Sequence, residues 1–322
     1  MESEISIFSI GGATMDVFLS GKALAARRDV KAHEYVEQFP LGEKIDIEEM
    51  FFDTGGGATN AAVTFARQGY RSGLVGKVGK DISGDEIMRA LGQEDVALEH
   101  IVRDSESHSS YSTILLAPNG ERTILKYHGA SDKLKVKDVK VEALSVDWLY
   151  VTTLGGNIKL LEKIIKHAGA HNIKIALNPG AGEIAKGKKL RKLIPALTVL
   201  IANKDEMQDI FGGISYKEII TKAASAGPTI VMTDGANGAY ACDGTTVFFA
   251  GLYQNAKVVD RTGAGDAFGS GFIAALARKE SVPQALSFAA ANASSVVQRV
   301  GSKGGILHTR KVKPLRIKIA KL

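Results

Sequence analysis

Two aspartates flank a run of small residues in the segment VVDRTGAGDAFGSG, residues 258–271. An apolar run ends near Val259, and small and apolar residues continue as a predicted helix from about Ala264. The first backbone N–H groups of a helix have no partner inside it, and the helix dipole adds about half a positive charge there. Glycines at 263 and 265 remove the Cβ atoms that would keep an anion away. The segment therefore predicts an anion hole formed by the N–H groups of Gly263, Ala264 and Gly265.

Asp266 falls in the first turn of that predicted helix, where a carboxylate would repel a bound phosphate. Its position is explained if it takes a proton from a hydroxyl group that attacks the phosphate, which is the role of a general base. The alternative is structural, because an acidic side chain pairs favourably with the positive end of a helix dipole. The residues alone leave both interpretations open.

A second glycine-rich stretch, DTGGGATN, covers residues 53–60. Its glycines precede a predicted helix and Asn60 falls in the first turn, so that a polyhydroxylated ligand could meet both the backbone and a side-chain amide. No Gly-Lys-Ser/Thr sequence follows, which excludes a Walker A loop. The glycine spacing also differs from a dinucleotide-binding fingerprint, and the preceding segment EMFFDT is charged. The stretch predicts a binding site for a small polar ligand.

The apolar pattern along the chain indicates the elements that must position these loops. Short apolar runs alternate with longer helical ones, which is typical of parallel strands connected by helices. We expect strands over residues 5–10, 72–75, 148–151, 173–177, 199–202, 229–232 and 246–249. We expect helices over residues 58–68, 84–91, 158–170, 205–210, 216–226, 264–277 and 283–299. The predicted fold class is α/β, with a mostly parallel central sheet and helices on both faces.

Two segments, residues 17–53 and 108–129, break this alternation. Both show polar and apolar residues in turn, as strands with one exposed face do. The sequence PNGE, residues 118–121, contains the Asn-Gly pair of a tight hairpin turn. We expect antiparallel strands that form a small β-sheet inserted into the parallel framework, where it covers a site, contacts a partner subunit, or does both.

The composition is that of an ordinary globular protein of 322 residues, with 45% hydrophobic and 24% charged residues. The 41 basic and 35 acidic residues leave a net charge of +6, which suits small anionic ligands; we expect no nucleic-acid partner. A single cysteine, Cys242, excludes an internal disulfide and a cysteine-rich metal site. The first residues do not resemble a signal peptide and no apolar run reaches about 18 residues, so we expect a cytoplasmic protein without a membrane partner.

Together, the two glycine-rich stretches resemble the two signatures of the PfkB, or ribokinase-like, family of carbohydrate kinases. Four further motifs match in chain order. They are GGATMD with Asp16, LNPGAG with Asn178, IANKDE with Asn203 and Glu206, and VMTDGANGAY with Thr233, Gly235 and Gly238. The resemblance covers nearly the whole chain. It implies a single ribokinase-like αβα sandwich over residues 1–322, with the segments 17–53 and 108–129 as a lid.

The resemblance implies ATP- and Mg²⁺-dependent phosphorylation of a hydroxymethyl group on a small sugar, as in ribokinases and fructokinases. Asp266 would be the general base, and the anion hole of Gly263, Ala264 and Gly265 would stabilise the transferred group. Residues that would grip the substrate are Asp16, Gly56, Gly57 and Asn60. Residues that would contact the nucleotide are Asn178, Asn203, Glu206, Thr233, Gly235, Gly238, Gly265 and Asn292. Asn203 and Glu206 would also organise Mg²⁺, although the same pair is typical of a helix cap.

Some members of this family are activated by a monovalent cation beside the anion hole. The matching groups for K⁺ are Asp260, Thr262 and the backbone carbonyls of Val296, Arg299, Gly301 and Gly305. In many members the lids also pair between subunits, which implies a homodimer.

Departures from the family pattern bear on the substrate. Arg261 stands where threonine, serine or proline is common, and would contact a phosphate or face solvent. Residues 152–155 replace the segment in which ribokinases present a glutamate to ribose, so a nucleoside kinase is an alternative function. Arg122 and Lys126 would share one face of the lid, toward the substrate or toward solvent. A non-catalytic sugar- or nucleotide-binding protein is a further alternative, against which a carboxylate beside a phosphate site argues.

Overall fold

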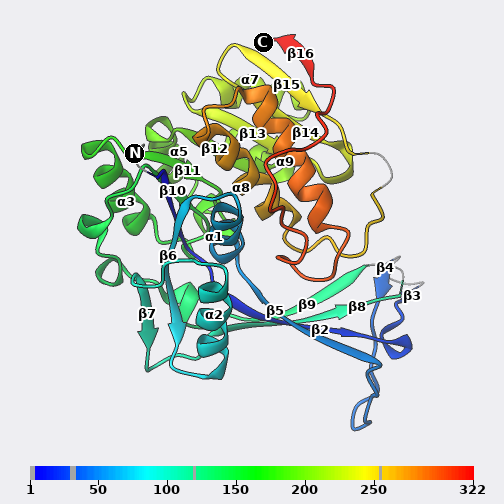
Figure 1. Cartoon of the computed structure of the whole chain (residues 1–322). Helices are drawn as coiled ribbons and strands as arrows, with labels where there is room; N and C mark the ends of the chain where they lie inside the picture. Colours follow the sequence, from blue (N-terminus) through cyan, green and yellow to red (C-terminus); the bar gives the residue numbers. More distant parts are fainter. Residues whose placement is uncertain (1–3, 30–33, 119–120, 254–255) are drawn as a thin grey trace.

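A ten-stranded sheet forms the centre of the molecule in the computed structural model, which describes residues 4–29, 34–118, 121–253 and 256–322 (Figure 1). In spatial order its strands are β16 (Lys318–Lys321), β15 (Thr246–Ala250), β14 (Ala239–Cys242), β13 (Thr229–Thr233), β12 (Val199–Asn203), β11 (Lys174–Leu177), β10 (Trp148–Val151), β1 (Ser6–Ile10), β6 (Arg71–Gly79) and β7 (Ile101–Asp104). From β13 to β7 the neighbours are parallel, and β14 to β16 extend one edge as antiparallel strands.

Helices cover both faces of this sheet, because successive strand residues point to opposite faces and both are apolar. In β10, Leu149 and Val151 join one buried cluster, and Trp148 and Tyr150 join another. The first cluster includes residues of α3 (Ile158–Ala170), α5 (Lys188–Leu193), α6 (Lys204–Phe211) and α7 (Tyr216–Ala224). The second includes residues of α1 (Gly57–Arg67), α8 (Ala264–Ala277) and α9 (Val282–Val296). These layers confirm the predicted α/β class with a mostly parallel sheet.

A second, smaller sheet projects from this body (Figure 1). Its strands, in spatial order, are β5 (Glu49–Gly55), β2 (Thr14–Ser20), β8 (Ser110–Leu116) and β9 (Arg122–Tyr127), and we call them the outer sheet. The pairs β2–β5 and β8–β9 are antiparallel as expected, but the two segments join through a parallel pair, β2–β8. The outer sheet begins at Thr14, three residues earlier than the sequence suggested. The expected turn at Asn119 and Gly120 lies outside the described residues.

The remaining elements are short or lie beside these sheets. A separate two-stranded ribbon pairs β3 (Arg27–Asp29) with β4 (Glu34–Val36). Helix α2 (Ile82–Gln93) packs through Ile87 and Leu91 on a third buried cluster that includes residues of α1 and β6, and α4 (Ala181–Ile184) is a single turn. Short 3₁₀ helices occupy Lys22–Leu24, Ala130–Lys133, Val136–Asp138, Val141–Ala143, Ile194–Ala196 and Gly235–Asn237. In the described part of the chain, no helix combines the length and the apolarity needed to cross a membrane.

Several element boundaries differ from the sequence expectation. Strand β6 runs to Gly79, and α2 begins at Ile82, because the Asp81 side chain caps it by accepting a hydrogen bond from the Gly84 N–H at 2.8 Å. Helix α9 ends at Val296 instead of residue 299. The sequence did not indicate β7 and β14, whose sequences are IVRD and AYAC. Both are short strands that pair at their positions in the sheet despite weak local patterns.

Candidate active site

The glycine-rich turn after residue 259 leads directly into α8, which begins at Ala264 as predicted. Asp260 is 2% exposed and holds this turn: its Oδ1 accepts hydrogen bonds from the Thr262 N–H at 2.9 Å and from the Thr262 hydroxyl at 2.7 Å. Its Oδ2 accepts from the Gly301 N–H at 3.0 Å. Gly263 has φ +77°, and a Cβ at that position would lie 2.6 Å from Cβ of Ser302. The turn therefore needs glycine there, and the N-terminus of α8 that follows has the geometry that suits an anion.

Asp266 points from the first turn of α8 toward α1. Its Oδ2 accepts a hydrogen bond from Nδ2 of Asn60 at 2.8 Å. A Cβ on Gly57 would lie 3.1 Å from Oδ1 of Asp266, so the glycine makes room for this carboxylate. Burial raises the pKa of the Asp266 carboxyl, while the hydrogen bond from Asn60 and the charge of Lys303 lower it. A half-buried carboxylate with a raised pKa at the N-terminus of a helix has the properties of a general base.

A cavity of about 560 Å³ lies on the other side of the α8 N-terminus. Its walls include the predicted nucleotide residues Asn203, Thr233, Gly235, Gly238 and Gly265, together with Ala264. Apolar side chains line much of the rest, from Ala239, Ala250, Leu252, Phe268, Ala290, Ala293 and Val297. The cavity thus combines an apolar region, which suits a flat base, with a helix N-terminus, which suits phosphates.

Two arginines also line this cavity. Arg261 comes from the turn before α8, and Arg122 comes from β9 of the outer sheet. The Nε atom of Arg122 is buried and has no hydrogen-bond partner within the described residues. Arg261 lies in the cavity wall and is also exposed, which agrees with both interpretations of this residue.

Three of the predicted nucleotide residues are not part of the cavity wall. Asn178 donates from Nδ2 to the Ile201 carbonyl at 2.9 Å. Glu206 forms a capping box with Asn203, with two hydrogen bonds of 2.9 Å, so the helix-cap interpretation of this pair holds. Asn292 is fully buried. Its amide donates to the Ala267 carbonyl at 2.8 Å and accepts from the Leu307 N–H at 2.9 Å, so it ties α9 to α8 and to the 301–307 loop.

The outer sheet presents a polar row to the same region. Strand pairing places Asp53, Asp16, Ser112 and Lys126 directly opposite one another on β5, β2, β8 and β9, and hence on one face. Asp16 is 6% exposed, and its carboxylate fills the space in which a side chain on Gly55 would lie. Burial raises the pKa of Asp16 to about 6, against the lowering effects of a hydrogen bond from Ser112 and the charge of Lys303.

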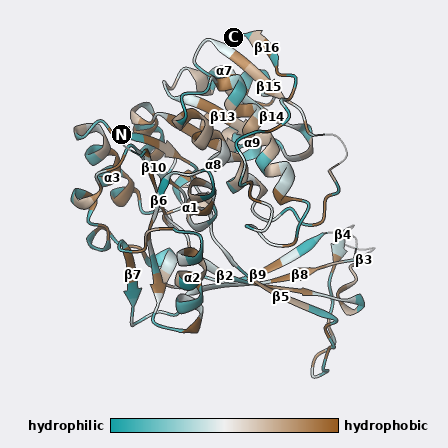
Figure 2. Cartoon of the chain, viewed as in Figure 1, coloured by the Kyte–Doolittle hydropathy of each residue, from teal (hydrophilic) through white to brown (hydrophobic). Residues whose placement is uncertain are grey.

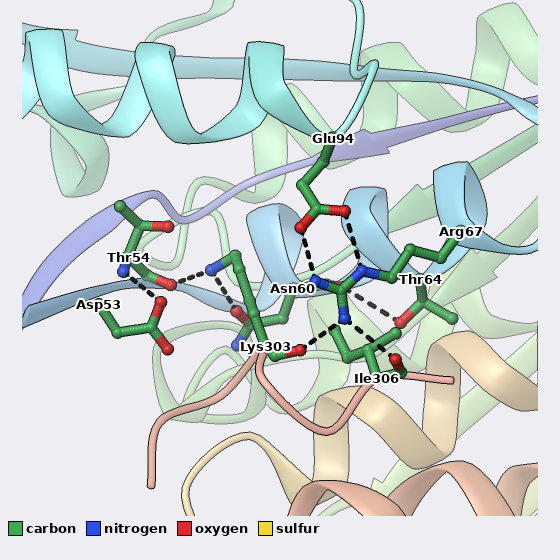
Figure 3. Close-up of polar contacts among 8 residues, drawn as sticks. All are labelled: Asp53, Thr54, Asn60, Thr64, Arg67, Glu94, Lys303 and Ile306. Atoms are coloured by element: carbon green, nitrogen blue, oxygen red, sulfur yellow. Dashed lines mark hydrogen bonds and ion pairs between the residues drawn. The ribbon is translucent and has the colours of Figure 1, made fainter. Parts of the chain in front are cut away.

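Sequence reasoning missed a buried lysine at the centre of this site. The ammonium of Lys303 donates to Oδ1 of Asn60 at 2.7 Å and to the carbonyl of Thr54 (Figure 3). It also donates to Oγ1 of Thr59 at 3.0 Å. Its side chain is almost fully buried, which lowers its pKa, whereas the charges of Asp53, Asp16 and Asp266 raise it. The only local signal was a lysine within the glycine-rich loop GSKGG. Its partners lie more than 240 positions away along the chain.

The loop that departs from the ribokinase pattern lies beside these residues. Thr152 contacts the same space as Asp266, because a Cβ on Gly57 would meet both side chains. The carboxylate of Glu183, which is fully buried, anchors this loop. It accepts hydrogen bonds from the Leu154 N–H at 3.0 Å and from the Thr153 hydroxyl at 3.2 Å. Residues 152–155 contain no acidic side chain that could take the place of the ribokinase glutamate. The nearby carboxylate of Glu183 is occupied by its hydrogen bonds to this loop.

Comparison with known proteins identifies the family. The model of the pfkB family carbohydrate kinase matches residues 28–310. Ribokinase from Haemophilus influenzae is 27% identical over 278 residues, which cover 82% of this chain and 88% of that protein. The structure of Arabidopsis thaliana ribokinase complexed with ribose and ATP is similar with a TM-score of 0.74 at 22% identity, covering 94% of this chain and 96% of that chain.

The crystal structure of adenosine kinase from Sinorhizobium meliloti is similar with a TM-score of 0.77 at 18% identity, covering 94% of this chain and 96% of that chain. At these identities the structural likenesses show the fold. The family model, in contrast, spans most of the sequence, including both glycine-rich stretches. The chain therefore belongs to the pfkB family of carbohydrate kinases and is a kinase.

Proposed function

We propose that this kinase transfers the γ-phosphoryl group of ATP to a hydroxymethyl group of a small sugar, with Asp266 as the general base. The observation that carries the proposal is the position of Asp266. Its carboxylate follows the cavity-lining Gly265 in α8 and is hydrogen-bonded to Asn60, on the side of the outer sheet's polar row. ATP would occupy the 560 Å³ cavity with its phosphates at the α8 N-terminus, and the sugar would bind between Asn60 and Asp16.

Phosphoryl transfer depends on positioning and charge stabilisation more than on covalent catalysis. The N–H groups of Gly263, Ala264 and Gly265 would donate to the transferred group; that of Ala264 now makes a long 3.3 Å hydrogen bond to the Arg261 carbonyl. Asp266 would accept the proton of the attacking hydroxyl through the carboxylate oxygen not bound to Asn60. Burial makes it a stronger base than an exposed aspartate.

The residues around the cavity fit Mg²⁺, which when bound with ATP would neutralise phosphate charge. Glu206 is close to the cavity-lining Asn203, and burial raises the pKa of its carboxyl. The negative charges of Asp205, Asp209 and Asp266 raise the pKa of Glu206 further. A divalent cation bound on this side of the site would reduce the repulsion among these carboxylates. Glu206 and Asn203 would orient water molecules of the ion.

Potassium remains part of the proposal. Asp260 is a buried carboxylate whose hydrogen bonds come from the neutral donors Thr262 and Gly301, and among the described residues it has no ion-pair partner. Buried charges are usually paired or bound to a metal ion. Within the described part of the chain, the carbonyl of Val296 accepts one turn hydrogen bond, from the Arg299 N–H at 3.1 Å, which leaves a lone pair for a cation. These features support a monovalent cation at the residues named above.

The polar row supports a free sugar as the acceptor, because hydroxyl groups pair with carboxylate and ammonium side chains. A nucleoside is the second candidate. It is favoured by the side chains of Phe51 and Ile124, which lie on the same face as the polar row and are 47% and 46% exposed. A base could stack on these residues while its ribose contacts Asp16.

The proposal is tested by measuring ADP release from ATP and Mg²⁺ with a panel of sugars and nucleosides, in K⁺ and in tetramethylammonium. We expect one sugar to stand out, and a nucleoside that outperforms every sugar would select the second candidate. In Asp266→Asn, turnover should fall at least about 10²–10⁴-fold while ATP binding stays unchanged. The control is Asp85→Asn, an aspartate in the first turn of α2, which should turn over normally. Near-normal turnover of Asp266→Asn would remove it from the mechanism.

Three broader statements belong to the same proposal. The chain would act as a single domain of residues 1–322, with the outer sheet as a lid that excludes water from the reaction. The outer sheets of two chains would pair in a homodimer. A cytoplasmic location remains an expectation from the sequence.

A further inference from the structure

The ammonium of Lys303 lies in a cage of oxygen atoms from two separate elements. The Thr54 carbonyl belongs to β5 of the outer sheet, and the Thr59 hydroxyl and Asn60 amide belong to α1. All three acceptors are neutral, so the positive charge is not cancelled by direct contact. An ammonium has three donors, and here each has one acceptor. These three contacts hold the group in one place.

This cage determines which way the Asn60 amide points. Its Oδ1 accepts from Lys303 at 2.7 Å and from the Ser302 hydroxyl at 2.9 Å. Both partners are donors, so the oxygen must face them and Nδ2 must face Asp266, to which it donates at 2.8 Å. One amide therefore links the ammonium to the carboxylate of the base.

The backbone of Lys303 is itself anchored. Arg67 of α1 donates to the carbonyls of Lys303 at 2.7 Å and Ile306 at 3.0 Å, and forms a two-bond ion pair with Glu94 at 2.5 and 2.8 Å (Figure 3). Next to it, the Ser302 N–H donates to Asp53 of β5 at 2.9 Å. The loop that carries Lys303 is thus fixed to the outer sheet and to α1 at once. Such anchoring of the backbone is typical of a side chain that must be held in a defined position for function.

We propose that Lys303 is a positioning residue for phosphoryl transfer, which orients Asn60 toward Asp266 and places its ammonium beside the base. The inference rests on the proposed role of Asp266. Among the described residues, the charged and titratable groups that interact electrostatically with Asp266 are Lys303, Glu206 and Tyr150. Lys303 is the one cation among them, so its loss leaves the base among groups that favour its protonated form.

The test begins with Lys303→Ala, which deletes the atoms of a propylammonium ion. At a fixed K⁺ concentration we expect kcat/KM to fall about 10- to 100-fold, with ATP affinity unchanged. Added propylammonium should restore activity saturably, whereas tetramethylammonium, which cannot donate a hydrogen bond, should not. Ser302→Ala is the matched control. It removes the other donor to Asn60 without removing a charge, and should lose less than about tenfold and not respond to propylammonium.

A second pair of variants covers the case in which Lys303→Ala does not fold. Lys303→Gln removes the charge in a side chain of similar length, and Lys303→Arg keeps it. The acid limb of the kcat/KM profile should move to higher pH by about one unit in Lys303→Gln, because Asp266 protonates more easily without the ammonium, and should stay in place in Lys303→Arg.

Wild-type kinetics in Lys303→Ala would overturn the inference, as would folded but inactive variants whose acid limb is unmoved and which propylammonium does not rescue. Failure of the proposed function is recognised separately, since Asp266→Asn would then keep its turnover. An inactive Asp266→Asn beside a normal Lys303→Ala would reject the role of Lys303 alone.

Discussion

Asp16 and Asp266 are two carboxylates, one buried and one half-buried, to which the fold gives different surroundings. Asp266 lies at a helix N-terminus with an amide donor, and Asp16 lies on a strand with a hydroxyl donor and the like charge of Asp53 nearby. Both feel the charge of Lys303, and burial raises the pKa of both. Two acidic groups in distinct environments allow one to accept the proton of the attacking hydroxyl and the other to hold the acceptor.

The burial of Asp16 should cost stability. Its pKa in the folded chain, about 6, lies above the reference value of 3.8. The folded state therefore binds the proton more tightly than the unfolded state, and stability is lost as the pH rises from about 4 through 6. The shift corresponds to about 3 kcal/mol at neutral pH. We expect Asp16→Asn to raise the free energy of unfolding at pH 8 and to change it much less at pH 4.5, as measured by urea denaturation.

The same variant should bind the acceptor poorly, with a KM at least about tenfold higher, because a charged hydrogen bond to a substrate hydroxyl contributes about 1.5–3 kcal/mol. A variant that is more stable than the wild type but binds the acceptor less tightly would show that Asp16 serves function at a cost in stability. A loss of stability at pH 8 would show that the hydrogen bond with Ser112 outweighs the cost of burying the charge.

The sequence alone could single out candidate residues where a local motif marks them. Asp266 and Asn60 stand in glycine-rich turns next to helix starts, and the structure joins them although 206 positions separate them. Lys303 could not be identified in the same way, because its importance comes from acceptors on β5 and α1 that only the folded chain brings to it. Asn292 shows the reverse case. The resemblance assigned it to nucleotide binding, but both ends of its amide form hydrogen bonds with the backbone, at Ala267 of α8 and at Leu307.

At the level of elements, the turn into α8 contains two glycines with different reasons to be glycine. Gly263 needs its positive φ of +77°, and a Cβ there would lie 2.6 Å from Ser302, whereas a Cβ on Gly265 would meet no atom within 4 Å. We expect Gly263→Ala to destabilise the protein by about 2 kcal/mol and to abolish activity. Gly265→Ala should fold normally and raise the KM for ATP about tenfold, because its methyl group enters the cavity.

Thermal unfolding and nucleotide titration of the two variants provide the measurement, each variant serving as the control for the other. Equal stability of both variants would mean that the turn relaxes around Ser302. Unchanged nucleotide affinity in Gly265→Ala would contradict the assignment of the phosphates to this helix N-terminus.

The sequence predicted elements best where the strands are buried on both faces. The runs at β1, β10, β12 and β13 are mostly apolar, and their bounds agree with expectation within one residue. The parallel pair β2–β8 was not predictable from local patterns, because its strands are separated by 89 residues from Ser20 to Ser110 and turn signals describe only neighbouring strands. That pair places Asp16 and Lys126 in the same polar row. This part of the candidate site could therefore not be predicted from the sequence either.

Considered as a whole, the molecule connects its two sheets at the reacting centre. Strand β5 returns from the outer sheet and passes directly into α1, and the end of that strand is bound by Ser302 and Lys303 from the loop after α9. The same loop is bound to Asp260 through Gly301, and hence to the turn that precedes α8. Displacement of the outer sheet would therefore move both Asn60 and the turn that precedes α8. In the proposed mechanism, binding of the acceptor to this sheet would thereby influence the position of Asp266.

The face of the outer sheet opposite the polar row is apolar and exposed. Phe52, Val17, Thr113 and Leu125 lie opposite one another across the four strands, on the face away from Asp16. Phe52 and Leu125 are 51% and 58% exposed, and Met50, on the same face, is 62% exposed. The hydrophobic colouring of these strands is visible in Figure 2. An exposed apolar sheet face is typical of a protein–protein contact, and pairing with a second copy would bury it.

We therefore expect sedimentation equilibrium to give twice the mass of one chain, and Phe52→Lys/Leu125→Lys to give a monomer with an unchanged unfolding temperature. Charges at the centre of an apolar interface oppose association, but at exposed positions of a folded monomer they cost little. Ile214→Lys is the control, because Ile214 is 85% exposed outside the outer sheet and its substitution should leave the dimer intact. If the outer sheet is steadied by its partner, the monomer should lose more affinity for the acceptor than for ATP, because the acceptor would bind along the polar row of this sheet whereas the ATP cavity includes Arg122 of β9. A wild-type protein that sediments as a monomer at every concentration would assign the apolar face to something other than a second copy.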